Sequence, residues 1–239
     1  MRDALRHFTA EFIGTFALVF VGGGALIAAR RPGSNIGLVE VALAHGIILA
    51  VMVTATMRVS GHFNPAVTAG FALTRRIGPA MAGIYIAAQL LGAMLAAYAL
   101  KGLVPPELFD AARGGGQAVA SDISFNQAIV LELIATFFLV FVIFGTAVDP
   151  KAPQVGGFAI GLTIAADILA IGPFTGASMN PARSLGPAVA SGIWEGHAIY
   201  WIGPLLGGIA AALLYEYLFI RRGVEPVDHG PIEPVAPRK

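Results

Sequence analysis

The chain has 239 residues, of which 56% are hydrophobic and only 12% are charged, with a formal net charge of +1. Soluble globular domains carry about 25% charged residues, so these charges are too few to cover a surface that faces water. The small net charge and the lack of a basic patch argue against nucleic-acid binding, and the absence of cysteine excludes disulfides and thiolate metal sites. The five histidines lack the spacing of metal ligands, so we expect neither a metal nor a cofactor.

Long apolar stretches dominate the sequence. A span needs about 20 apolar residues to cross the ~30 Å hydrocarbon layer of a membrane. Six stretches satisfy this length: Phe8–Ala29, Gly37–Met57, Pro79–Leu100, Asn126–Val148, Val155–Ile171 and Ala198–Ile220. The first also resembles a secretory signal, but Glu11 lies inside it and a matching segment recurs later, which favours a membrane span.

The segments between these spans are of three kinds. Two apolar segments, Asn64–Thr74 and Asn180–Ala190, are too short to cross a membrane. The region Gly102–Ser124 contains two prolines and three consecutive glycines and is predicted to be a long polar loop. The proline-rich residues 223–239 are predicted to form a disordered cytoplasmic tail, which leaves residues 1–222 as a single membrane domain.

The two halves of the chain resemble each other. AEFIGTFALVFV (Ala10–Val21) aligns with LELIATFFLVFV (Leu131–Val142) at an offset of 121 residues, and the two short segments are 116 residues apart. Each half, about 8–101 and 125–220, therefore holds three spans and one short segment. Because three is odd, the second half enters the membrane inverted. The expected fold is an all-α membrane protein of six transmembrane helices plus two half-helices, with its functional site near the midplane.

Basic residues indicate how the chain is oriented. If the spans alternate in direction, one side of the membrane receives Arg2, Arg6, Arg58, Arg75, Arg76, Lys151, Arg221 and Arg222, and the other receives Arg30, Arg31, Lys101 and Arg113. Cytoplasmic loops carry the excess of arginine and lysine. We therefore expect both termini to be cytoplasmic, in the plasma or inner membrane of the cell.

Each short segment begins with the same triplet. Asparagine is a preferred N-cap and proline is favoured at the first helical position, and about ten helical residues rise ~15 Å, half a membrane. Two such half-helices would meet at the midplane with their amides facing across an opening, and their positive ends would repel cations there. A single Asn-Pro is typical of a turn, but two at equivalent positions indicate a pore. The triplets are Asn64, Pro65 and Ala66, and Asn180, Pro181 and Ala182.

Glu11 and Glu132 occupy equivalent positions in the repeat. A carboxylate inside a membrane is costly and needs partners. One interpretation is a proton relay. The preferred interpretation is structural, with each carboxylate accepting backbone N–H groups of the non-helical chain that leads into a half-helix.

The motifs SGHFNPAVT (Ser60–Thr68) and SMNPARS (Ser178–Ser184) resemble those of the aquaporins, the major intrinsic proteins, and the resemblance extends from Glu11 to Phe219. It implies one pore per subunit, usually within a homotetramer, and the same structural role for the two glutamates. It places four residues at the narrowest ring: His45, Ile168, Ala177 and Arg183. Backbone carbonyls are expected along the pore at Gly61, His62, Phe63, Ser178 and Met179.

Three of these residues have other interpretations. His45 can be read as a buried, satisfied histidine between helices, and Arg183 as an arginine that extends to the membrane interface. Asp167, which precedes the ring residue Ile168, is hypothesised to brace the ring through a polar partner, such as one in the loop between the halves.

The ring composition indicates which solutes pass. A strict water filter in this family pairs phenylalanine with histidine, whereas His45, Ile168, Ala177 and Arg183 look more like the plant tonoplast type. Such a ring is wider and less polar, so water is expected to pass and ammonia, urea and hydrogen peroxide are candidates. The loop Gly102–Ser124 has no histidine, which argues against ammonia, and Ser184, where glycerol channels carry aspartate, argues against glycerol.

The leading hypothesis is a passive water channel that excludes protons and ions and also admits small neutral solutes. One alternative is a facilitator mainly for ammonia, urea or glycerol. Another is a closed structural or adhesion member of the same fold. An enzyme is not expected, because the sequence shows no nucleophile–base pair, metal cluster or phosphate-binding loop.

Overall fold

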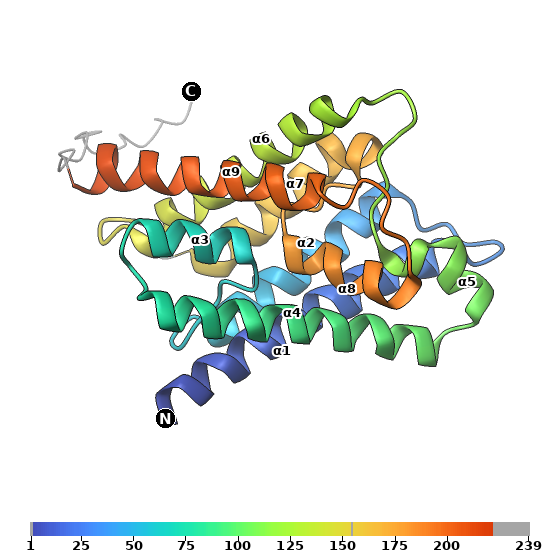
Figure 1. Cartoon of the computed structure of the whole chain (residues 1–239), viewed down its shortest axis with the longest axis horizontal. Helices are drawn as coiled ribbons and strands as arrows, with labels where there is room; N and C mark the ends of the chain where they lie inside the picture. Colours follow the sequence, from blue (N-terminus) through green and yellow to red (C-terminus); the bar gives the residue numbers. More distant parts are fainter. Residues whose placement is uncertain (1, 154, 222–239) are drawn as a thin grey trace, which may run out of the picture.

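The computed structural model describes residues 2–153 and 155–221 (Figure 1); the predicted tail 223–239 lies outside the described residues. Among these, six helices are long and apolar enough to cross a membrane. They are α1 (Arg2–Ala28), α2 (Leu38–Thr56), α4 (Pro79–Leu103), α6 (Phe125–Ile143), α7 (Gly156–Thr175) and α9 (Ile199–Tyr215), with α6 and α9 continued by the π-helical turns η2 (Phe144–Val148) and η3 (Glu216–Ile220). The predicted six spans are confirmed, with ends that differ by a few residues.

Two half-length helices complete the bundle. α3 (Pro65–Leu73) has 9 residues and α8 (Pro181–Ser191) has 11, so each rises about 15 Å. Both begin in the middle of the molecule and run outward in opposite directions (Figure 1). α3 runs toward the face where α1 begins and α9 ends, here called the terminal face, and α8 runs toward the opposite face.

The half-helices are exchanged between the repeats. α1 packs on α4 and α6 packs on α9, within each half, but α3 packs mainly on α9 and α8 mainly on α4. Each half-helix is therefore held by a long helix of the other repeat. The two halves cannot separate without exposing both half-helices.

α2 and α7 cross at the centre with their backbones in contact. A side-chain carbon added to Gly46 would collide with the carbonyl of Gly161 and with Ala165, and one added to Gly161 would collide with the carbonyl of Gly46 and with Ala50. Small residues permit this close approach of membrane helices. The contacts are reciprocal between residues 115 positions apart, which shows that α2 and α7 are related by the inverted repeat.

The segment 102–124 differs from the predicted polar loop. It contains the short helix α5 (Pro106–Ala111) and the turn η1 (Arg113–Gly115), and the side chain of Phe109 is buried. Proline at the first helical position starts α5. Gly115, at φ 81°, brings the backbone against Gly23 of α1. The prediction was wrong here because the prolines and glycines shape a packed turn.

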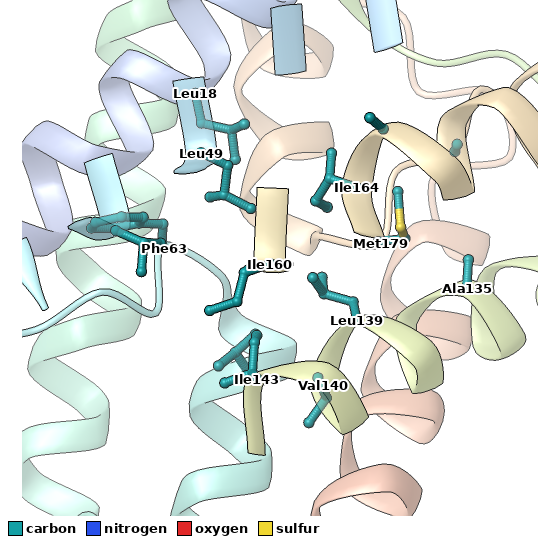
Figure 2. Packing of buried hydrophobic residues seen from close by; sticks show 14 of the residues in the cluster. Leu18, Leu49, Phe63, Ala135, Leu139, Val140, Ile143, Ile160, Ile164 and Met179 are labelled. Carbon is teal, nitrogen blue, oxygen red and sulfur yellow. The ribbon is translucent and has the colours of Figure 1, made fainter. Parts of the chain in front are cut away.

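Apolar side chains fall into an outer and an inner set. The outer set is exposed on the long helices, as expected for a surface that faces lipid, and includes Ile47, Val51, Ile134, Leu162 and Leu206. The inner set forms a large cluster between α2, α6, α7 and the two half-helix loops. Figure 2 shows part of this cluster, with Leu18, Leu49, Leu139, Ile143, Ile160 and Ile164 gathered from four helices.

Candidate functional site

The two asparagines cap the half-helices as their sequence position predicts. The Asn64 side chain accepts a hydrogen bond from the N–H of Ala66 at 2.8 Å. The Asn180 side chain accepts from the N–H groups of Ala182 and Arg183 at 3.0 and 3.2 Å. Proline is the first residue of each helix, where its missing N–H leaves no bond unmade.

Each asparagine also reaches into the other half. The Asn64 amide nitrogen donates to the carbonyl of Met179 at 2.7 Å, and that of Asn180 donates to the carbonyl of Phe63 at 2.8 Å. Phe63 and Met179 adopt left-handed backbone conformations with φ of 51° and 53°, which cost about 1–3 kcal/mol each. The crossed bonds stabilise this strained backbone and fix the two half-helix ends against each other.

The amides therefore meet at the centre while each is tied to the opposite loop. A side-chain amide has two N–H donors, and the crossed bond uses one. Both asparagines line the central cavity described below. The second donor of each remains for a molecule in that cavity.

The buried carboxylates hold the loops that lead to these helices. Glu11 accepts hydrogen bonds from the N–H groups of His62 and Phe63 at 2.8 and 2.7 Å, from Gln89 at 2.6 Å, and from Ser60. Neither Glu11 nor its counterpart Glu132 is among the residues that line the central cavity. A relay of protons along that cavity would therefore not pass through Glu11.

Glu132 plays the matching part in the second half. It accepts from the hydroxyl of Thr175 at 2.7 Å and from the N–H groups of Ser178 and Met179 at 2.9 and 2.7 Å. Both glutamates are fully buried, so these donors replace the water that the carboxylates lose. The arrangement of donors supports the structural interpretation of both residues.

A narrow cavity of about 20 Å³ lies at the centre of the molecule and is lined by residues of both halves. All four residues assigned to the narrowest ring by resemblance line it, on the side of the opposite face: His45, Ile168, Ala177 and Arg183. Of the five residues with expected pore carbonyls, Gly61, His62, Ser178 and Met179 line the cavity. Phe63 is not among the residues that line the cavity, and its carbonyl, like that of Met179, accepts an asparagine amide of the other half.

His45 and Arg183 are bonded to each other. The Nδ1 of His45 lies 2.8 Å from the carbonyl of Val41, and its Nε2 lies 2.9 Å from the Nη2 of Arg183. Because a guanidinium only donates, Nε2 accepts and Nδ1 carries the ring hydrogen. His45 is thus a satisfied buried histidine and also a residue of the cavity wall, so its two interpretations are not exclusive.

Arg183 stays inside the protein and does not extend to the interface, because only 4% of it is exposed. While Nη2 is bound by His45, Nη1 is buried and has no hydrogen-bond partner among the described residues. A buried donor without a partner is costly. Since Arg183 lines the cavity, a polar molecule inside the cavity can supply the missing acceptor.

The polar partner proposed for Asp167 is not found. Its Oδ2 is buried without a hydrogen-bond partner among the described residues, and Asp167 does not line the cavity. Successive residues of a helix point about 100° apart, so α7 turns Ile168 toward the cavity and Asp167 away from it. The described residues therefore give no support to the hypothesis that Asp167 braces the ring through a polar contact, and the hypothesis stays untested.

Several hydrogen bonds that support the two loops were not predicted from the sequence. Gln89 bonds both Glu11 and Thr68, at 2.6 and 3.0 Å. His62 lies 3.1 Å from Thr68, and Ser178 lies 2.5 Å from Ser184. Each of the last two bonds joins the residue two before an asparagine to the residue four after it. The two bonds are 116 residues apart, so the repeat offset in the sequence could have predicted one from the other.

Six spans and two half-helices that meet at a narrow central cavity define a membrane channel of the broken-helix class. The comparisons with known proteins agree. The sequence matches the family described as Major intrinsic protein over residues 1–215. The chain belongs to this family, the aquaporins, and is a multi-pass membrane protein that serves as a water channel.

Its relatives include the probable aquaporin TIP3-2 of Arabidopsis thaliana, which is 44% identical over 98% of this chain and 91% of its own length. The aquaporin TIP4-4 of Zea mays is 43% identical over 92% of this chain and 88% of its own length. Among solved structures, the aquaglyceroporin from Plasmodium falciparum matches with a TM-score of 0.78 and 25% identity, over 90% of this chain and 96% of that one.

Proposed function

We propose that water crosses the membrane in single file through the central cavity, while protons and ions are excluded. The observation that carries this proposal is the crossed pair of asparagines, which holds two helix N-termini at the cavity wall with one amide donor of each free. A water molecule there accepts hydrogen bonds from two fixed donors. Its own hydrogens then point away toward its neighbours, which interrupts a chain of waters able to relay a proton.

Charge adds a second obstacle to cations. Each half-helix N-terminus carries about half a positive charge, and the guanidinium of Arg183 adds a full charge on the side of the opposite face. Such a field repels protons and cations, whereas a neutral molecule crosses it without a comparable cost.

His45, Ile168, Ala177 and Arg183 are proposed as the selectivity filter. In this proposal Arg183 donates to the passing molecule through Nη1, and His45 fixes the orientation of the guanidinium through Nη2. Ile168 and Ala177 leave the remaining wall apolar. The filter thus offers a solute one strong donor on one side and little polar contact on the other.

A second candidate function is the passage of small neutral solutes, above all urea and hydrogen peroxide. The apolar side chains of Ile168 and Ala177 in the cavity wall favour it, because they add no donor that a strict water filter would place there. Ammonia is less favoured, since the segment 102–124 holds no histidine, and so is glycerol, since Ser184 follows Arg183.

The proposal extends to assembly and placement. The protein acts as a homotetramer with one pore in each subunit and takes no part in enzymatic chemistry. It lies in the plasma or inner membrane with both termini in the cytoplasm, because the terminal face carries the larger share of arginines.

Reconstitution in liposomes tests the proposal. Osmotic shrinkage is followed by stopped flow, with parallel uptake of urea, glycerol and methylamine as an ammonia analogue. Water flux well above that of bare lipid, with slower glycerol uptake, is expected. Glycerol or methylamine flux that rivals water flux would favour the facilitator, and water flux no faster than bare lipid would favour the closed structural member.

A further inference from the structure

The inverted repeat gives each filter residue a counterpart in the other half of the pore. α2 and α7 are related by 115 positions, as the reciprocal contact of Gly46 with Gly161 shows, and the two loops are related by 116, as the crossed asparagine bonds show. These offsets relate His45 to Ile160, Ile168 to Val53, Ala177 to Gly61 and Arg183 to Val67. All four counterparts line the same cavity.

The counterpart ring lies on the side of the terminal face and differs sharply in chemistry. The filter holds a hydrogen-bonded histidine and arginine, whereas Ile160 and Val67 stand at their equivalent positions and are buried and apolar. Val53 is the buried counterpart of Ile168. The polar wall here is limited to the strip formed by Gly61 and His62.

A fifth pair of equivalent positions holds a glycine beside the filter and a large apolar residue on the side of the terminal face. At the offset of 121 that relates α1 to α6, Gly22 corresponds to Ile143. A side-chain carbon on Gly22 would collide with the ring of His45, so the filter side needs glycine there. On the other side Ile143 fills the equivalent position and lines the cavity close to Ile160 (Figure 2).

We propose that Val53, Val67, Ile143 and Ile160 form a second, apolar constriction in series with the filter, and that it selects water against solutes with several polar groups. The inference rests on the proposed function, since it assumes that the cavity conducts. A water molecule in this ring keeps hydrogen bonds to the waters before and after it. Urea has more donors and acceptors than one file of water can satisfy, so several of its polar groups cross the ring unpaired, which is costly.

The first test truncates two side chains of the apolar constriction and measures the selectivity of the channel between urea and water. Ile143→Ala and Ile160→Ala, singly and together, are reconstituted, and urea uptake is compared with osmotic water flux in the same vesicles. We expect the urea-to-water ratio of the double variant to rise about tenfold, the change that ~1.4 kcal/mol off a barrier produces. Ile134→Ala and Leu162→Ala are matched controls, because these residues lie on the lipid-facing sides of α6 and α7, and they should leave the ratio unchanged.

The second test locates the ring without relying on selectivity. The chain contains no cysteine, so Ile143→Cys and Ile160→Cys introduce unique targets for a mercurial. We expect the reagent to stop water flux in both variants and to leave the wild type and Ile134→Cys unaffected.

The outcomes separate the inference from the function it rests on. A wild type that conducts no water would overturn the proposed function. A conducting wild type whose double alanine variant keeps the wild-type urea-to-water ratio would overturn the second constriction alone, as would mercurial-resistant flux in both cysteine variants.

Discussion

Arg183 and His45 illustrate how single residues acquire their role in the pore. They lie 138 positions apart in the chain and come together as a pair at 2.9 Å. His45 uses its two ring nitrogens to join a helix carbonyl to the guanidinium. The arginine is therefore fixed in direction, and one of its nitrogens, Nη1, stays available to a molecule in the pore.

Replacing Arg183 should weaken charge exclusion more than water flow. In Arg183→Val the positive charge and the unpartnered donor disappear, so we expect proton or cation leak to appear while water flux persists. Leak is measured with a pH-sensitive dye trapped in the vesicles. The exposed Arg30→Val serves as the control and should stay tight; an Arg183→Val channel as tight as the wild type would remove Arg183 from the filter.

The buried glutamates make a prediction about stability. Glu132→Gln replaces an acceptor oxygen with an N–H₂ group that faces the donors of Thr175, Ser178 and Met179. A buried donor is then left unpaired, and we expect a loss of about 3 kcal/mol, seen as a lower melting temperature in detergent. Glu195 is a surface residue that pairs with Arg113, so Glu195→Gln should lower the free energy of unfolding by only about 0–1 kcal/mol. Equal melting temperatures for the two variants would contradict the structural role.

At the residue scale the sequence predicted which residues belong to the site better than it predicted which of them contact each other. The asparagine caps were predictable because capping is local, within three residues of the helix start. The bond between His45 and Arg183 was not, because it depends on how α2 meets α8 in space. The partner expected for Asp167 is not seen among the described residues for a related reason: neighbours in sequence point in different directions on a helix, so Asp167 does not face the cavity as Ile168 does.

At the scale of elements, the crossing of α2 and α7 sets the geometry of the pore. Gly46 and Gly161 allow the two backbones to touch, and the residues on either side of this contact carry the two rings. The crossing therefore determines how far apart the walls of the cavity stand.

A glycine substitution at the crossing should be far more harmful than the same change elsewhere. In Gly46→Ala the added carbon meets the Gly161 carbonyl, so we expect a lower yield of folded protein and a lower melting temperature. Gly83→Ala in α4 adds a carbon that meets nothing within 4 Å and should gain helix stability, by up to about 1 kcal/mol. Size-exclusion chromatography and thermal unfolding compare them; a Gly46→Ala protein as stable as the Gly83→Ala protein would show that the helices do not need this contact.

The sequence predicted the helices well where the length of an apolar segment and the residues that cap it determine the helix. Span length identified the six long helices, and the Asn-Pro starts with too few apolar residues identified α3 and α8. It failed in the segment 102–124, because a few apolar residues, among them the buried Phe109 and Ala112, and two glycines with positive φ are enough to pack a turn against α1. The packing of each half-helix on a long helix of the other repeat was also not predicted, because it depends on contacts between residues far apart in the chain.

At the scale of the whole molecule, inversion of the repeat explains both the symmetry and the asymmetry of the pore. The backbone, the caps and the carboxylate anchors follow the repeat closely. The wall does not, because one ring carries His45 and Arg183 while the other carries Ile160 and Val67. The two repeats thus share their backbone arrangement, whereas differences in a few side chains make the two ends of the passage chemically different.

The assembly is testable directly. We expect native mass spectrometry in detergent to show a complex of four subunits of 24.7 kDa each. A monomer that holds together and conducts alone would contradict the tetramer while leaving the pore within the subunit intact.

The central claim is that the crossed asparagines and the opposed half-helices make a passage for water that protons cannot follow. Osmotic water flux and proton flux measured side by side in the same proteoliposomes test it most directly. The account predicts water flux far above that of bare lipid together with proton flux no greater than that of bare lipid. Water flux equal to that of bare lipid, or protons that enter along with the water, would contradict it.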